Sequence, residues 1–202
     1  HAIGDRANKE ILDRYEIAFD ELADRASDHR FRIEHAQHLH PDDIPRFAGL
    51  GVIPAMQAVH LSSDRPWAID RLGEQRIKEG AYMWQALLQS GIPIVNGTDV
   101  PVEPLNPIAS LYASISRKTL KGTPEGGYEP EQKMTREQAL RSYTLDAAYG
   151  AFEEDIKGSI TVGKLADFTI YSQDLMTVAE EEFLNTEIAM TIFDGKVVYT
   201  RE

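Results

Sequence analysis

Apolar positions along the first hundred residues follow two different periods. Over residues 6–25 they recur every three or four positions between Asp, Glu and Arg, which predicts an amphipathic helix. Residues 31–35 alternate apolar and charged side chains, as a strand does. The short apolar runs 52–56 and 92–95 predict two more strands, although Pro54 weakens the first of these assignments.

Helical segments separate the predicted strands. Residues 41–50 open with Pro-Asp-Asp, which is typical of a helix start, and residues 74–90 are helical up to a stop at Gly91. Strands that alternate with helices over short connections are typical of parallel βαβ units. The first part of the chain is therefore predicted to be an α/β protein with a parallel sheet.

Beyond residue 100 the alternation becomes less regular. Residues 107–117 have a helical pattern, and residues 118–133 form a loop rich in Gly and Pro. Thr135 and Gln138 have the Thr-x-x-Gln spacing of a capping box. This spacing predicts a helix that begins there and continues to about Tyr149.

The tail of the chain has a β-rich pattern instead. Residues 167–171 and 189–193 are rich in β-branched and aromatic side chains, and Asp194-Gly195 separates the second run from residues 196–199. Asp-Gly between two β-rich runs is the strongest short signal for a hairpin. The tail is therefore predicted to form a small antiparallel sheet.

Composition and charge exclude several classes of protein. The 202 residues carry a net charge of −12, which argues against coating nucleic acid or an anionic membrane. The absence of cysteine excludes disulfides, thiolate metal sites and Cys nucleophiles. No run approaches the 18 or so apolar residues of a membrane span, and no signal peptide is recognisable. We therefore expect a cytoplasmic protein with neither a nucleic-acid nor a membrane partner.

Three residues with metal-binding side chains stand where strands are predicted to end. His35 ends the strand over residues 31–35, Asp99 follows the run 92–95, and His1 precedes a helix, as a strand end would. In a parallel α/β barrel the carboxyl ends of the strands hold the active site. Imidazole and carboxylate are ligands of Zn²⁺ and similar ions. The spacing leaves two interpretations open, a metal site and ordinary polar residues at the rim of a barrel.

Five segments of the chain resemble the metal-dependent amidohydrolase superfamily, and in particular the amidohydrolase family 3 group. They occur in the order expected for that group and together span nearly all of the chain. The segments are His1–Asn8, Arg32–Gln37, Asn96–Pro101, Tyr143–Ala148 and Gly158–Phe168.

The resemblance implies a fold for each part of the chain. Residues 1–155 would be the C-terminal half of a (β/α)₈ TIM-like barrel, strands five to eight, and residues 156–202 the C-terminal strands of a small β-sandwich. The family's H-x-H on strand one and its carboxylated Lys or Glu on strand four have no counterpart, since the H-x-H at His38-Leu39-His40 follows His35 in a loop and not at a strand end. We therefore expect a C-terminal portion that needs the missing N-terminal half of the barrel and is inactive alone.

The resemblance also implies roles for individual residues. His1 and His35 would be metal ligands from strands five and six, and Asp99 would be both a ligand and the general base that acts on water. The metal would be divalent, most simply zinc, with iron or manganese as alternatives. Gln57 and His60, which follow the strand over residues 52–56, are expected to contact a small-molecule substrate, against the alternative of a structural role.

The resemblance indicates hydrolysis of a C–N bond in an amide, carbamate or cyclic amide. Deaminases of the superfamily commonly carry Glu three residues after the strand-five His, whereas this chain has Gly4 there. A metal-dependent deaminase remains an alternative. Another is a non-catalytic half-barrel that assembles through its open sheet edges with another chain, a homo-oligomer being one form of such an assembly.

Overall fold

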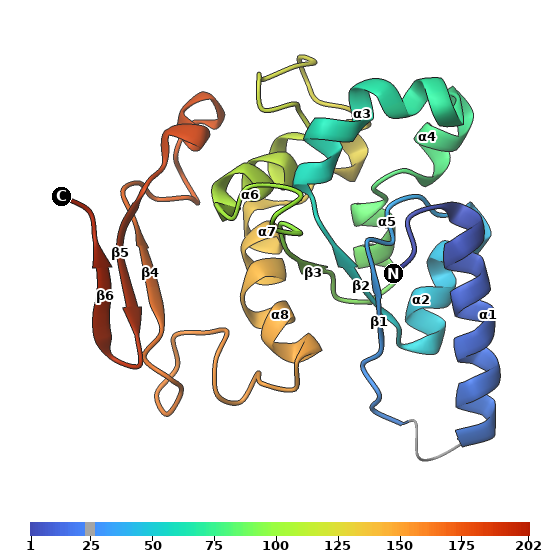
Figure 1. Ribbon diagram of the computed structural model, residues 1–202, viewed down its shortest axis with the longest axis horizontal. Coiled ribbons are helices and arrows are strands. Elements are labelled where there is room, and N and C mark those ends of the chain that lie inside the picture. Colours follow the sequence, from blue (N-terminus) through green and yellow to red (C-terminus); the bar gives the residue numbers. More distant parts are fainter. Residues whose placement is uncertain (23–26) are drawn as a thin grey trace.

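The computed structural model describes residues 1–22 and 27–202, which contain one parallel and one antiparallel sheet (Figure 1). The parallel sheet has the order β1 (Arg32–Glu34), β2 (Ile53–Met56), β3 (Val95–Asn96). All three strands lie within predicted strand regions or overlap them, so the prediction of an α/β protein with a parallel sheet is confirmed. The final strand is shorter than predicted, because only Val95 and Asn96 pair with β2.

A fourth segment lies beside β1 in the parallel direction. Ala2 forms a parallel bridge with His35, and its N–H donates to the carbonyl of Glu34 at 3.0 Å. The N–H of Ala36 in turn donates to the carbonyl of Ala2. The order across the sheet is therefore residues 1–3, β1, β2 and β3, which follows the order of the chain.

Helices alternate with these parallel segments. They are α1 (Asp5–Leu22), α2 (Ile44–Leu50), α3 (Val59–Leu72), α4 (Glu74–Gly80), α5 (Trp84–Gln89), α6 (Pro107–Ser116), α7 (Arg136–Tyr143) and α8 (Leu145–Gly150), with short 3₁₀ helices at Pro41–Asp43, Pro130–Gln132 and Glu180–Asn185. The predicted first helix agrees with α1 as far as Leu22, and the rest of that prediction lies outside the described residues. None of the described helices is long and apolar enough to cross a membrane.

Two predicted helices are each broken in the structure. The single helix predicted over residues 74–90 is wrong, because α4 and α5 are separated by Tyr82, whose φ is 52°. The N–H of Tyr82 donates to the carbonyl of Gln37, and the carbonyl of Gly80 accepts from the N–H of Leu39. Hydrogen bonds to another loop therefore replace the helical ones. The helix that begins after Thr135 is likewise divided at Thr144 into α7 and α8.

The capping box is confirmed atom by atom. The Thr135 hydroxyl accepts the N–H of Gln138 at 3.1 Å, and the Gln138 side-chain oxygen accepts the N–H of Thr135 at 2.8 Å. Two N–H groups that the first turn of a helix leaves free are thereby satisfied.

The tail forms the second sheet. Strands β4 (Phe168–Tyr171), β5 (Ile188–Phe193) and β6 (Lys196–Thr200) are antiparallel, and Asp194-Gly195 connects the last two. Both turn residues have positive φ, 50° and 70°, which a tight hairpin favours. The predicted antiparallel tail is confirmed. In Figure 1 this sheet lies beyond α6 and α8, on the far side of the molecule from α1.

The core lies between the parallel sheet and its helices. Ile33, Ile53 and Met56 contribute from the strands, and Phe47 and Trp84 contribute from α2 and α5. The central strand β2 is buried along its whole length, and Pro54 lies within it, paired with Ile33. Burial of these side chains fixes the strands, and hence the places where they end.

Candidate metal centre

The candidate centre lies where the parallel strands end. His35 follows β1 directly, Gln57 follows β2 directly, and Asp99 comes three residues after β3. His60 lies in the first turn of α3, which begins two residues after Gln57. The four residues therefore gather at the carboxyl edge of the sheet, which is the edge that carries the active site in parallel α/β barrels.

Three of these side chains meet at one point. The ligand atoms of His35, His60 and Asp99 all lie within 4.8 Å of one another. Nε2 of His60 lies 3.3 Å from Oδ2 of Asp99. The side chain of His60 is 8% exposed and that of Asp99 is 34% exposed, so the centre is open on one side and buried on the other.

His1 reaches this centre through His35. Its Nδ1 lies 3.3 Å from Nε2 of His35, and the bridge between Ala2 and His35 fixes the backbone beside it. The sequence predicts His1, His35 and Asp99 as the metal ligands. The structure brings His35 and Asp99 together, adds His60 to them, and places His1 against His35.

The donor set and its spacing fit a divalent cation. Two ligands held tetrahedrally at 2.0–2.1 Å from zinc lie about 3.3–3.4 Å apart. The His1–His35 and His60–Asp99 pairs both have separations of 3.3 Å. Imidazole nitrogen and carboxylate oxygen together suit zinc, and iron or manganese as well.

Gln57 orients one of the candidate ligands. Its side-chain oxygen lies 2.8 Å from Nδ1 of His35, so that nitrogen carries the proton and donates it. The Nε2 atom of His35 then keeps its lone pair and faces the centre. The amide nitrogen of Gln57 donates to the carbonyl of Ala55. The sequence predicts a substrate contact for Gln57, whereas both ends of its amide are engaged inside the chain.

Two residues at the centre are absent from the sequence-based prediction. Oε1 of Glu103, in the loop after Asp99, lies 3.4 Å from Nδ1 of His60 and accepts a hydrogen bond from the Ser63 hydroxyl at 2.6 Å. Ser63 stands three residues after His60, so both lie on one face of α3. That spacing is a weak signal for Ser63. For Glu103 the only signal is an acidic residue four positions after Asp99.

Backbone strain is concentrated at the same place. His35 (φ 75°), Ala36 (φ 43°) and Asp99 (φ 58°) all adopt left-handed conformations that are unfavourable for residues with a Cβ. Each costs on the order of 1–3 kcal/mol, and such residues cluster at functional sites. The strain turns the chain sharply after β1 and around Asp99, where the side chains of the candidate ligands lie.

The turn that carries His60 is fixed by neighbouring elements. The N–H of Ala58 donates to the side-chain oxygen of Asn96 at 3.0 Å, and the N–H of Val59 donates to the Ser110 hydroxyl at 3.3 Å. The amide nitrogen of Asn96 lies 3.4 Å from the hydroxyl of Ser114. The start of α3 is thereby held to β3 and α6.

The segment that carries His1 is held by a buried amide. The side-chain nitrogen of Asn8 is shared among several carbonyls, with Ala2 at 3.1 Å, Gly4 at 3.0 Å and His38 at 3.2 Å. His38 lies outside the centre, and its pKa is lowered because burial disfavours the charged ring. Asn8 therefore connects the start of the chain to the loop after His35.

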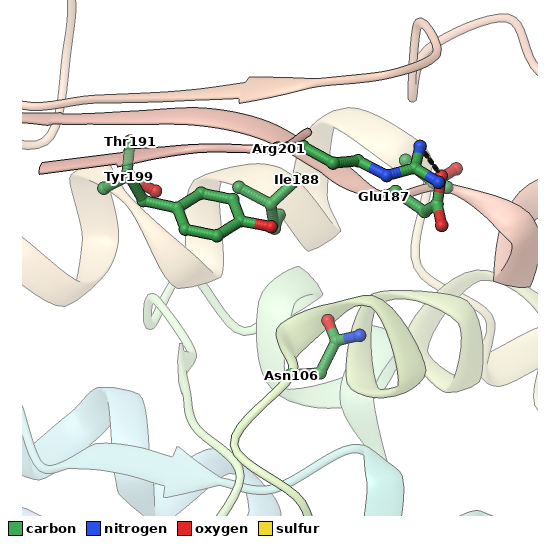
Figure 2. A pocket seen from close by; sticks show the side chains of 7 residues that line it. Asn106, Glu187, Ile188, Thr191, Tyr199 and Arg201 are labelled. Atoms are coloured by element: carbon green, nitrogen blue, oxygen red, sulfur yellow. Dashed lines mark ion pairs between the residues drawn. The ribbon is translucent and has the colours of Figure 1, made fainter. Parts of the chain in front are cut away.

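A separate pocket of about 400 Å³ lies between the start of α6 and the tail sheet (Figure 2). Its lining includes Asn106, Tyr199 and Arg201, and Arg201 is paired with Glu187. None of the predicted site residues lines it. The chemistry expected of the chain therefore belongs to the centre at the strand ends and not to this pocket.

Parallel strands that alternate with helices define an α/β protein, and a cluster of nitrogen and oxygen side-chain atoms lies at the carboxyl ends of those strands. The model of the amidohydrolase family matches residues 1–199. The chain belongs to the amidohydrolase family, which confirms the resemblance seen in its sequence.

Three curated relatives match nearly all of the chain. Protein LONG AFTER FAR-RED 3 of Arabidopsis thaliana is 37% identical over 98% of this chain and 33% of its own length. The putative amidohydrolase YtcJ of Bacillus subtilis (strain 168) is 31% identical over 100% of this chain and 37% of its own length. N-substituted formamide deformylase of Arthrobacter pascens is 26% identical over 100% of this chain and 36% of its own length. The chain thus spans about a third of the length of the curated relatives it matches.

Solved structures with similar folds include two uncharacterized metal-dependent hydrolases. The protein from Pyrococcus furiosus is 32% identical, with a TM-score of 0.70 over 88% of this chain and 33% of that chain. The protein from Pyrococcus horikoshii OT3 is 29% identical, with a TM-score of 0.74 over 90% of this chain and 35% of that chain. These likenesses support an α/β amidohydrolase fold for the described residues.

Proposed function

We propose that this chain supplies part of the active site of a metal-dependent hydrolase that cleaves a C–N bond in an amide, carbamate or cyclic amide. The observation that carries the proposal is the meeting of His35, His60 and Asp99 within 4.8 Å, each just beyond a different parallel strand. The name of the A. pascens relative, an N-substituted formamide deformylase, refers to C–N cleavage of this kind.

The residues that would hold the metal are His1, His35 and Asp99, with zinc the simplest choice and iron or manganese as alternatives. A bound divalent ion polarises a carbonyl group and lowers the pKa of water, so that water becomes a nucleophile near neutral pH. Gln57 keeps the proton of His35 on Nδ1 and leaves Nε2 free to coordinate. The ligand geometry is thereby prepared by this chain's own hydrogen bonds.

Asp99 would act as the general base and acid. Its carboxylate lies at the open side of the centre, 34% exposed, where it can accept a proton from water and return it to the leaving nitrogen. His60 lies beside it, with Nε2 3.3 Å from Oδ2 of Asp99, and with Gln57 it is a candidate contact for a small-molecule substrate. Gly4, at the position where deaminases of this superfamily commonly carry a glutamate, favours hydrolysis over deamination.

We further propose that residues 1–155 are strands five to eight of a TIM-like barrel, and that residues 156–202 are strands of a β-sandwich. Four parallel segments in chain order support the half-barrel, which would need four more strands to close. On the tail sheet, Val197, Val198 and Tyr199 are each exposed, which supports a second layer over that sheet. These strands would come from an N-terminal half, or from another chain in an oligomer, and the chain alone would be inactive. A cytoplasmic location stays a prediction.

Metal analysis and a substrate panel test the proposal. The full-length protein, purified and reconstituted with Zn, Fe or Mn, is expected to retain one of these ions through gel filtration. It is expected to hydrolyse an N-acyl amine, a carbamate or a cyclic amide, and a His35→Ala variant should lose both properties. A protein that retains none of the ions contradicts the proposal. Release of ammonia from an amino-substituted ring, without hydrolysis of these substrates, would support the deaminase alternative instead.

A further inference from the structure

We propose that His60 is a further ligand of the candidate metal centre and that Glu103 is the positioning residue that prepares it. This inference rests on the proposed function and deepens it. The sequence-based interpretation gives His60 a substrate contact and gives Glu103 no role. The geometry around the His60 ring instead favours a ligand role for His60 and a positioning role for Glu103.

The His60 ring lies between two carboxylates. Its Nδ1 is 3.4 Å from Oε1 of Glu103, and its Nε2 is 3.3 Å from Oδ2 of Asp99. A doubly protonated ring could donate to both carboxylates, whereas a singly protonated ring can donate to only one of them. In the second case the other nitrogen turns a lone pair toward a carboxylate oxygen, an arrangement that a cation between the two atoms makes favourable.

The surroundings of Glu103 decide which side takes the proton. The Glu103 side chain is 15% exposed, and no Lys or Arg pairs with it among the described residues. Its oxygen Oε1 already accepts the Ser63 hydroxyl at 2.6 Å. It lies behind the ring, on the side away from Asp99. A mostly buried carboxylate needs donors, and His60 Nδ1–H is the donor within reach.

On the Asp99 side of the His60 ring no proton is needed. Asp99 belongs to the cluster with His35, and the hydrogen bond to Gln57 leaves Nε2 of His35 with a lone pair. With Nδ1–H of His60 directed at Glu103, two ring nitrogens and one carboxylate oxygen converge without a proton between them. That is the donor set of a divalent cation. The carboxylate–histidine pair of Glu103 and His60 is also the usual arrangement behind a metal-binding imidazole.

Zinc affinity and the protonation of the ring test the inference in the full-length protein. The dissociation constant for zinc is measured by chelator competition for wild type, His60→Ala, Glu103→Ala, Glu103→Gln and Val102→Ala. Glu103→Gln keeps an oxygen that accepts from Nδ1, and Val102→Ala alters an exposed neighbour in the same loop. Long-range ¹H–¹⁵N spectra of histidine-labelled protein show which nitrogen of His60 carries the proton, and circular dichroism checks that each variant is folded.

We expect His60→Ala and Glu103→Ala to weaken zinc binding about 10- to 100-fold, and Glu103→Gln and Val102→Ala to stay close to wild type. In the zinc-loaded wild type, His60 should carry its proton on Nδ1 and show a zinc-shifted Nε2. Zinc bound with wild-type affinity by His60→Ala, or a proton on Nε2 of His60 in the loaded protein, overturns the inference and leaves the proposed function standing. A wild-type protein that binds no zinc, iron or manganese fails at the earlier step and contradicts both.

Discussion

Gln57 and His35 form a hydrogen bond of 2.8 Å between the amide oxygen of one and Nδ1 of the other. The two residues follow neighbouring strands, β1 and β2, so the bond crosses the sheet at the edge where the candidate ligands gather. A ring that donates from Nδ1 presents Nε2, which means that Gln57 sets the orientation of His35 from outside the centre.

Substitution of Gln57 should therefore weaken metal binding without touching a ligand. Gln57→Leu removes the acceptor for Nδ1–H of His35, and the expected loss in zinc affinity is about 10- to 100-fold. Gln57→Glu keeps an acceptor and should lose less. Chelator competition measures both affinities, and Gln75→Leu, at an exposed position on α4, is the matched control. Equal affinities for the Leu variant and wild type would show that His35 needs no partner on Nδ1.

Asp99→Asn should reduce turnover strongly while the protein stays folded. The amide cannot accept the proton of water as a carboxylate does, and general acid–base catalysis contributes about 10²- to 10⁴-fold. We expect a loss of kcat of that size, measured with the hydrolysable substrate that the panel identifies. Asp70→Asn, on the exposed face of α3, is the control and should keep wild-type turnover. An active Asp99→Asn enzyme would remove Asp99 from the proton-transfer role.

Thr135→Ala should destabilise the protein by about 1 kcal/mol, since it removes the acceptor that caps α7. The Thr135 hydroxyl accepts the N–H of Gln138 at 3.1 Å, and a serine can do the same. Thr135→Ser should therefore stay close to wild type. Urea unfolding followed by circular dichroism gives the free energies of unfolding. A Thr135→Ala protein as stable as wild type would mean that water replaces the cap at no cost.

Asp146 should make stability depend on pH. Burial raises its pKa above the ordinary 3.8, although the nearby Arg141 lowers it in part. The folded state therefore binds this proton more tightly than the unfolded state does. The stability that the protonated carboxyl contributes is present below pH 3.8 and is lost as the pH rises through the raised pKa.

Asp146→Asn stays neutral at every pH, so its free energy of unfolding at pH 7 should exceed that of wild type. The difference should shrink as the pH falls toward 3.8. Thermal melts from pH 7 to pH 4 measure it, with Asp155→Asn as the control at an exposed carboxyl. A variant that is less stable than wild type at pH 7 would show that the ion pair with Arg141, at 3.0 Å, outweighs the burial.

The features that the sequence predicts well are those encoded by near neighbours. The hairpin at Asp194-Gly195 and the cap at Thr135 each depend on residues at most three positions apart, and both are present in the structure. His35 and Asp99 could be placed together because the carboxyl ends of parallel strands share one edge of a sheet. The sequence pattern locates the strand ends, and the parallel topology then brings these ends to one edge of the sheet.

Features that depend on distant partners could not be predicted. The break at Tyr82 arises from hydrogen bonds to the loop at Gln37. Arg117, fully buried after α6, donates to the carbonyls of Tyr82 and Tyr128 and pairs with Glu129, and no local pattern marks it for burial. Glu103 belongs to this group as well, since its partners lie about forty positions earlier in the chain.

Asn96 has a mechanical consequence for the centre. It lies on β3, three residues before Asp99, and its side chain holds the N–H of Ala58 at the start of α3. A displacement of β3 would therefore be transmitted to the backbone beside His60 as well as to Asp99, which makes the distance between these two side chains less sensitive to movement of the strand.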